Sequence, residues 1–253
     1  MLIEAITVCD QYSDFLAETV KWNIDHVDRW IIVSSPEDEA THEVCRKYNL
    51  ELLISEDHKK YGDTFNKGRL IERGLQHLSA EGWRLHIDAD IVLPYHFKKL
   101  LRAADIQEDK IYGCDRIMIN GYDEWLKFQN IGWMTHDYQN RVVIPKGYQI
   151  GTRWCHIDGG YTPIGFFQLW HSNNDHFRGT RIRPYPTRHN DACRSDVQFS
   201  MKFDRSKREL LPEVVVVHLE SEPAKLGANW CGRRTAPFGV KNNNAVSGCV
   251  STS

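Results

Sequence analysis

The sequence lacks any long apolar run. No stretch approaches the roughly 20 apolar residues that a membrane-spanning helix needs. Residues 1–18 contain only a short apolar run, with no basic segment before it and charged residues directly after it, unlike a secretory signal. We therefore expect a cytoplasmic protein without membrane insertion.

Two further absences concern cysteine and glycine. The seven cysteines are an odd number without any C-x-x-C pair, which argues against a disulfide framework and a structural zinc site and favours reduced thiols. Neither the G-x-G-x-x-G nor the G-x-x-x-x-G-K-[ST] fingerprint is present, which excludes the usual dinucleotide-binding and P-loop enzymes.

What is present is ordinary for a globular protein. Of 253 residues, 41% are hydrophobic and 26% are charged. The formal net charge of -2 excludes a molecule that binds polyanions over its whole surface. The length is enough for one large domain, and we find no repeat or linker that would divide it.

Strand and helix patterns alternate through the first hundred residues and predict an α/β fold with a mostly parallel central sheet flanked by helices. Ser35 is the expected N-cap of the second helix, and Asp10, Ser34, Asp57 and Asp90 fall at the carboxyl ends of the expected strands. Ligands on such sheets bind at the carboxyl ends of strands. The expected strands are 2–8, 30–35, 50–55 and 83–93, and the expected helices are 14–25, 35–49 and 64–80.

The second half of the chain is less regular. We expect a helix over 94–104 and strands over 110–119 and 212–221. Between them, residues 121–194 are aromatic, glycine-rich and irregular, which predicts either functional loops or strands that the pattern does not reveal.

The stretch "RLHIDADIVLP" places two carboxylates in an otherwise apolar strand. Side chains alternate along a strand, so His86, Asp88 and Asp90 are expected on one face. Two carboxylates on one face suit a hard cation such as Mg2+ or Mn2+. The alternative is a pair of acids that cap loops or bind arginines at a strand end.

The preceding helix begins with a cluster of polar and basic residues, Asn66, Lys67 and Arg69. Cations at a helix N-terminus oppose the helix dipole, but together with free N–H groups they form a phosphate cradle. A solvated basic face is the alternative.

Together, "FNKGRLIERGL" and "RLHIDADIVLP" resemble the donor half of GT-A glycosyltransferases, and in particular the galactosyltransferases of the lactose-synthase type. The resemblance covers residues 1–95 and recurs at "SDVQF" and "VVVVHL". It implies a single GT-A (Rossmann-like) domain with a nucleotide-sugar donor half at 1–95, a loop-rich acceptor half at 96–220, and a lid and mobile tail at 221–253.

The resemblance implies roles for individual residues. Asp90 and His218 would bind Mn2+ or Mg2+, and Asp88 would bind it through water or hold the ribose. A lone histidine ending an apolar strand is otherwise a structural residue. The remaining residues implied in binding the nucleotide-sugar, which we take to be a UDP-sugar, are Asp10, Gln11, Asp57, Asn66, Lys67, Arg69, Ala89, Trp230 and Arg233.

A catalytic base is expected near the start of the helix "SDVQF". Inverting members of the family carry a pair of acids there, whereas this sequence has Ser195 before Asp196. Asp196 is the base candidate, and helix capping is its alternative role. Asp158, beside a Gly-Gly turn, is a rival base.

The segment 178–208 bears on the acceptor, because nine basic residues against three acidic ones give it a net charge of +6. It could bind nucleic acid, such as a hydroxylated base in phage-type DNA, an anionic glycan or small molecule, or it could be a solvated face. Two alternatives to glycosyl transfer stay open, a sugar-phosphate nucleotidyltransferase and a non-catalytic nucleotide or carbohydrate binder. The sugar and the oligomeric state do not follow from the sequence.

Overall fold

The structure, a computed structural model, describes residues 1–79, 81–131, 143–174, 176–177, 180–181 and 184–239. Its strands are β1 (Ile3–Val8), β2 (Arg29–Ser34), β3 (Glu51–Ile54), β4 (Trp83–Ile87), β5 (Ile91–Val92), β6 (Ile111–Asn120), β7 (Phe167–His171), β8 (His176–Phe177), β9 (Thr180–Arg181) and β10 (Arg208–Glu220). Its α-helices are α1 (Ser13–Asn23), α2 (Glu39–Tyr48), α3 (Lys67–Leu75), α4 (Phe97–Ala103), α5 (Tyr122–Gln129) and α6 (Ser195–Ser200).

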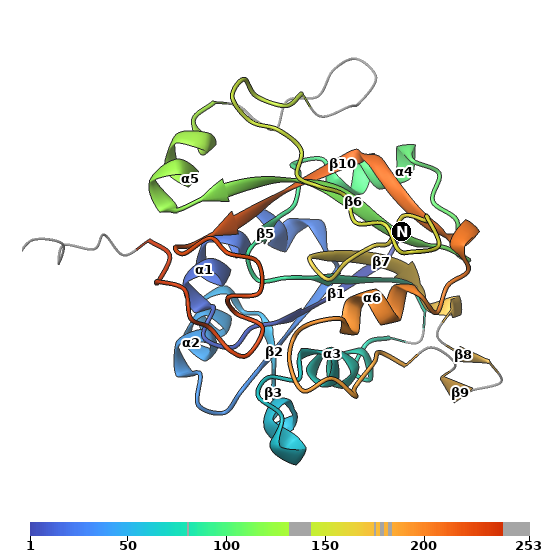
Figure 1. Cartoon of the computed structure of the whole chain (residues 1–253), viewed down its shortest axis with the longest axis horizontal. Coiled ribbons are helices and arrows are strands. Elements are labelled where there is room, and N and C mark those ends of the chain that lie inside the picture. Colours follow the sequence, from blue (N-terminus) through green and yellow to red (C-terminus); the bar gives the residue numbers. More distant parts are fainter. Residues whose placement is uncertain (80, 132–142, 175, 178–179, 182–183, 240–253) are drawn as a thin grey trace, which may run out of the picture.

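One eight-stranded sheet joins the two halves of the chain in the order β3-β2-β1-β4-β7-β6-β10-β5 (Figure 1). The pairs within β3-β2-β1-β4 and the β6-β10 pair are parallel, whereas β7 and β5 run antiparallel to their neighbours. The predicted α/β class with a mostly parallel sheet is confirmed. The boundaries proposed at 95 and 220 stay predictions.

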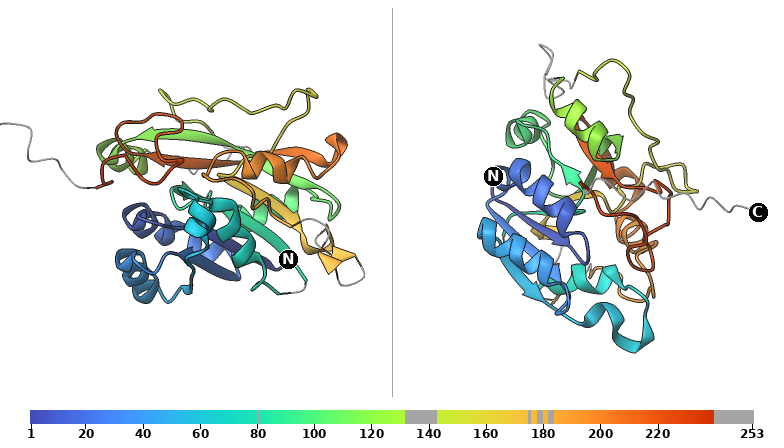
Figure 2. Two further views of the ribbon diagram at one scale, coloured as in Figure 1. Left: turned by 60° about the horizontal axis from the view of Figure 1, so that its bottom comes forward. Right: turned by 90° about the vertical axis from the view of Figure 1, so that its left-hand side faces the viewer.

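Alternating side chains of the strands build an apolar layer on each face of the sheet. On one face, Ala5 of β1 and Ile32 of β2 pack in a cluster with residues of α1, α2 and α4. On the other face, Ile6 and Val33 pack in a cluster with residues of α3 and α6. Figure 2 shows helices on both sides of the sheet, with α1 and α2 side by side.

Helix starts follow local side-chain chemistry. The N-cap of α2 is Asp38, whose Oδ1 accepts from the Thr41 amide at 3.1 Å, so the expectation that Ser35 caps this helix was wrong. Asp38 also accepts from the Gln11 amide at 2.6 Å, which joins the β1–α1 loop to α2. The N-cap of α3 is Asn66, whose Oδ1 accepts from the Arg69 amide at 3.0 Å.

The strand expected over 83–93 is interrupted at the two aspartates. The chain leaves β4 at Ile87, turns through residues 88–90, and re-enters the sheet as β5, which pairs with β10. Two side chains of α1 hold this turn: Thr19 donates to the Ala89 carbonyl at 2.8 Å, and Asn23 donates to the Ile91 carbonyl at 2.7 Å. Because of the turn, the expected alternation along one continuous strand was wrong.

The segment 121–194, expected to hold functional loops or unrecognised strands, contains helix α5 and the strands β7, β8 and β9. Helix α5 packs Trp125 and Phe128 into a third apolar cluster with β6 and β10. Strand β7 is inserted antiparallel between β4 and β6 at the centre of the sheet. Among the described residues, no helix is long and apolar enough to cross a membrane.

Candidate functional site

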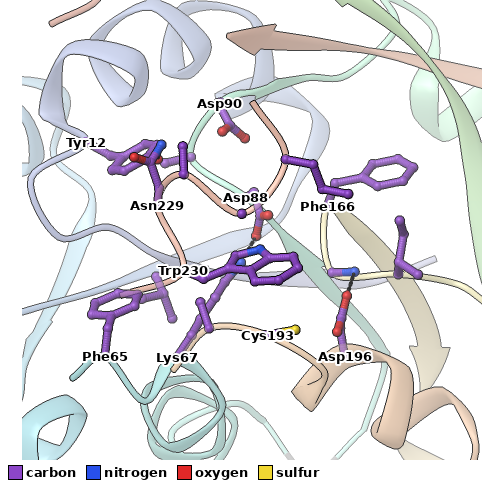
Figure 3. Close-up of a pocket in the computed structure, with 18 of the residues that line it drawn as sticks. Tyr12, Phe65, Lys67, Asp88, Asp90, Phe166, Cys193, Asp196, Asn229 and Trp230 are labelled. Carbon is purple, nitrogen blue, oxygen red and sulfur yellow. Dashed lines mark hydrogen bonds and ion pairs between the residues drawn. The ribbon is translucent and has the colours of Figure 1, made fainter. Parts of the chain in front are cut away.

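A cavity of about 540 Å³ opens where β1, β4 and β10 end. Its walls come from widely separated parts of the chain, including the 88–90 turn, the 164–166 loop, the start of α6 and the segment 225–235 (Figure 3). The sequence-predicted residues that line it are Asp10, Lys67, Asp88, Ala89, Asp90, Asp196, His218, Trp230 and Arg233.

Asp88 is compensated by a lysine of the preceding helix. Lys67, the first residue of α3, donates through Nζ to Asp88 Oδ1, and the Asp88 amide donates to the Phe166 carbonyl at 3.3 Å. Burial alone would lower the pKa of Lys67, but the Asp88 carboxylate raises it above its ordinary value. Burial, with the Lys67 charge added, lowers the pKa of His86 well below its ordinary value, so the imidazole beneath this pair is neutral.

Asp90 faces a different partner. His218 Nε2 lies 3.5 Å from Asp90 Oδ2 and 4.0 Å from Glu220 Oε1. Burial alone would raise the pKa of Asp90, but His218 lowers it below its ordinary value, so the carboxylate is ionised. Asp90 Oδ1 is buried and has no hydrogen-bond partner in the described part of the chain.

This orphaned oxygen is the observation that bears on a cation. No three histidine, cysteine or carboxylate side chains among the described residues converge closely enough to form a metal site on their own. Mg2+ and Mn2+ sites, however, commonly combine one or two protein ligands with water and substrate phosphates. Asp90 and His218 fit that type of site, since one supplies an unsatisfied carboxylate oxygen and the other an imidazole nitrogen.

Sequence reasoning missed Arg116, a half-buried residue of β6 in the cavity wall. Its NH1 group lies 3.1 Å from His218 Nδ1, and its guanidinium carbon lies 4.5 Å from the Phe166 ring centroid. Burial lowers the pKa of Arg116, with the nearby carboxylates opposing that effect. The arginine was predictable only as part of a strand, because nothing in "CDRIMI" indicates that this side chain reaches His218.

The two candidate bases occupy different places. Asp196, in the first turn of α6, lines the cavity and accepts from the Gly165 amide at 2.6 Å. Asp158 is not part of the cavity wall, and it forms an ion pair with Arg208, a side chain only 1% exposed. The structure therefore places Asp196, and not its rival, in the wall of the same cavity as Asp88 and Asp90.

The other residues expected at the donor stabilise local structure outside the cavity wall. Arg69 pairs with Asp63 at 2.8 Å and donates to the Asp57 carbonyl at 2.7 Å. Asn66 caps α3, as described above, and also donates to the Thr187 carbonyl at 2.9 Å. The Gln11 side chain is exposed.

The segment 221–239 lies against α1 (Figure 1). Its residues between Lys225 and Thr235 form part of the cavity wall. Arg233 forms two bonds with the Asp14 carboxylate and donates to the Gln11 carbonyl at 2.7 Å. Phe238 stacks on Phe15 with ring centroids 4.6 Å apart. Trp230, 39% exposed, lies near the centre of the close-up in Figure 3. Arg233 is thus engaged by Asp14 and anchors the segment to α1.

Replacing Asp14 by Asn is expected to loosen this segment, because the Arg233 ion pair is lost and the Phe238 amide keeps a weaker acceptor. Amide hydrogen exchange in residues 225–239 should become roughly tenfold faster, which corresponds to about 1.4 kcal/mol of local stability. The exposed Asp25→Asn variant is the matched control. Unchanged exchange in Asp14→Asn would show that the ion pair does not hold the segment.

The basic segment 178–208 lies partly outside the described residues, which include neither Arg178 nor Arg183. Of those described, Arg208 is buried against Asp158 and Lys207 pairs with Asp109. Both charges are therefore used within the protein and do not contribute to a free basic face.

Comparison with models of protein families and with curated protein sequences finds no match. Among solved structures, the chain is similar to mannosyl-3-phosphoglycerate synthase from Rubrobacter xylanophilus, with 17% identity and a TM-score of 0.38 over 46% of this chain and 41% of that one. It is also similar to glucosyl-3-phosphoglycerate synthase from Mycobacterium tuberculosis in complex with Mn2+, UDP-glucose and glycerol 3-phosphate. There the identity is 15% and the TM-score 0.36, over 46% of this chain and 44% of that one. Each match spans less than half of either chain.

Proposed function

We propose that this protein is a metal-dependent glycosyltransferase of the GT-A type that moves a sugar from a nucleotide-sugar, a UDP-sugar, to an acceptor hydroxyl with inversion. One observation carries the proposal: Asp88, Asp90, Lys67, His218 and Asp196 gather in one cavity at the carboxyl ends of the strands. Open α/β sheets bind their ligands at this edge.

Asp90 and His218 would hold Mn2+ or Mg2+, with Asp88 contributing through water. The cation would act as a Lewis acid on the diphosphate, where negative charge develops as the sugar leaves. The unpartnered Asp90 oxygen and the ionised state of this carboxylate support the assignment.

The chain's own groups would perform the remaining steps. Lys67 presents a half-buried ammonium at the N-terminal end of α3, which suits the donor's phosphates. Asp196 would take the proton from the acceptor hydroxyl as that oxygen bonds to the anomeric carbon and the nucleoside diphosphate departs. The Gly165 amide fixes one oxygen of Asp196 and leaves the other to the acceptor.

The proposal is tested by ligand-dependent stabilisation and by turnover. UDP with Mn2+ should raise the melting temperature by several degrees, whereas neither alone should match it, because the cation bridges protein and diphosphate. UDP-sugar should then be hydrolysed slowly in the absence of acceptor. Pyrophosphate release from a nucleoside triphosphate and a sugar phosphate would instead identify a nucleotidyltransferase. Nucleotide-sugar binding without any turnover would identify a binding protein.

Replacing Lys67 by Gln should raise the KM for the nucleotide-sugar by about 10- to 100-fold. A charge-assisted hydrogen bond contributes about 1.5–3 kcal/mol, and the variant also leaves the Asp88 carboxylate without its partner. Initial rates against donor concentration measure the effect. Lys59→Gln, an exposed lysine on the preceding 3-10 helix, is the control. An unchanged KM in Lys67→Gln would remove Lys67 from the donor site.

A further inference from the structure

The cavity contains several basic side chains, and their partners differ. Lys67 is paired with Asp88, and Arg233 is paired with Asp14. Arg194 and Lys225 are exposed at the rim. Arg116 is half-buried and forms no ion pair within the ranges that the structure describes.

The hydrogen bonds of Arg116 are also incomplete. Its Nε atom is buried and has no partner among the described residues, and its NH1 group is directed at His218 Nδ1. A buried N–H group without an acceptor points to a ligand that supplies one.

Phe166 links Arg116 to the base candidate. The Phe166 ring stacks on the Arg116 guanidinium, and its carbonyl accepts from the Asp88 amide. The residue before it, Gly165, donates to the base candidate Asp196. Arg116 therefore packs on the residue next to the one that holds Asp196, and it also lies beside His218.

We propose that Arg116, with Phe166 beneath it, binds an anionic group of the acceptor, a phosphate or a carboxylate carried close to the hydroxyl that receives the sugar. This inference rests on the proposed function, because it names the acceptor class of the same site. Guanidinium groups bind both anions in a bidentate fork, and a partly buried fork without a carboxylate partner is ready for one. A cation on a cavity wall suits a small acid better than a polymer backbone.

The test is calorimetric titration of the full-length protein with sulfate, as a tetrahedral anion, and with acetate, as a carboxylate. Ionic strength is held constant, and the protein is saturated with UDP and Mn2+. One of the two anions should bind in the presence of the nucleotide, and Arg116→Gln should weaken that binding at least tenfold. Arg116→Lys, which keeps the charge and loses the fork, should weaken it less. Arg73→Gln, an exposed arginine on α3, should match the wild type.

Three outcomes would overturn the inference: neither anion binds, the binding survives in Arg116→Gln, or UDP with Mn2+ displaces the anion. The last outcome would assign Arg116 to the donor's diphosphate. If UDP with Mn2+ does not bind at all, the proposed function fails and the acceptor assignment fails with it. The same titration without nucleotide then still reports separately whether Arg116 forms an anion site.

Discussion

Replacing Asp90 by Asn is expected to lower cation-dependent turnover of the UDP-sugar by about 10³-fold. Asn keeps the shape of the side chain and removes the charge that would hold the cation. Loss of a Lewis acid at a developing negative charge is worth several kcal/mol, and about 1.4 kcal/mol corresponds to each factor of ten. The measurement is kcat/KM against Mn2+ concentration.

Stability without ligand should change little in this variant. Removing the Asp90 charge relieves its repulsion of Asp88, but it also weakens the contact with His218 that holds the pKa of Asp90 below its ordinary value. The melting temperature without ligand should therefore stay within a few degrees of the wild type, and the stabilisation by UDP with Mn2+ should disappear. Asp105→Asn is the control, since Asp105 is exposed and has a left-handed φ of 48° that Asn adopts readily. Full activity in Asp90→Asn would show that the two aspartates are structural.

The first half of the fold was predictable because its signals are local. Each of the strands β1 to β4 reads as a short apolar run, and each helix between them has apolar residues at helical spacing. The meeting of Asp10, Asp88 and Asp90 at one edge then follows from the direction of parallel strands. The 88–90 turn was missed because two side chains of α1, Thr19 and Asn23, hold it.

The second half depends on contacts that no local pattern contains. Strand β7 lies antiparallel between β4 and β6, and unlike β1 to β4 it is not part of an alternating strand–helix pattern that would mark it in the sequence. The ion-pair partners of the basic side chains in the site were likewise not predictable from local sequence. Lys67 and Arg233 were expected at the phosphates, yet their partners Asp88 and Asp14 became visible only when distant segments packed together. Arg116 gave no sequence signal at all.

Replacing Gly68, the second residue of α3, is expected to destabilise the fold strongly. A Cβ atom on it would overlap the Pro186 carbonyl oxygen and would lie 2.9 Å from Ser195 Cβ. The Pro186 oxygen is backbone, and the Ser195 Cβ atom is fixed directly to the backbone at the start of α6, so neither can move aside as the end of a flexible side chain could. Gly68→Ala should therefore lower the free energy of unfolding by about 3 kcal/mol, measured by urea denaturation.

The effect should reach the site as well as the stability. Lys67 precedes Gly68 and Asp196 follows Ser195, so a shift between α3 and α6 moves the ammonium and the base candidate relative to each other. Gly151→Ala is the matched control, because its Cβ would meet Arg116 at 3.6 Å and should change stability by less than about 1 kcal/mol. If Gly68→Ala is as stable as Gly151→Ala, then α3 and α6 do not pack as closely as described, and the cavity between them has a different shape.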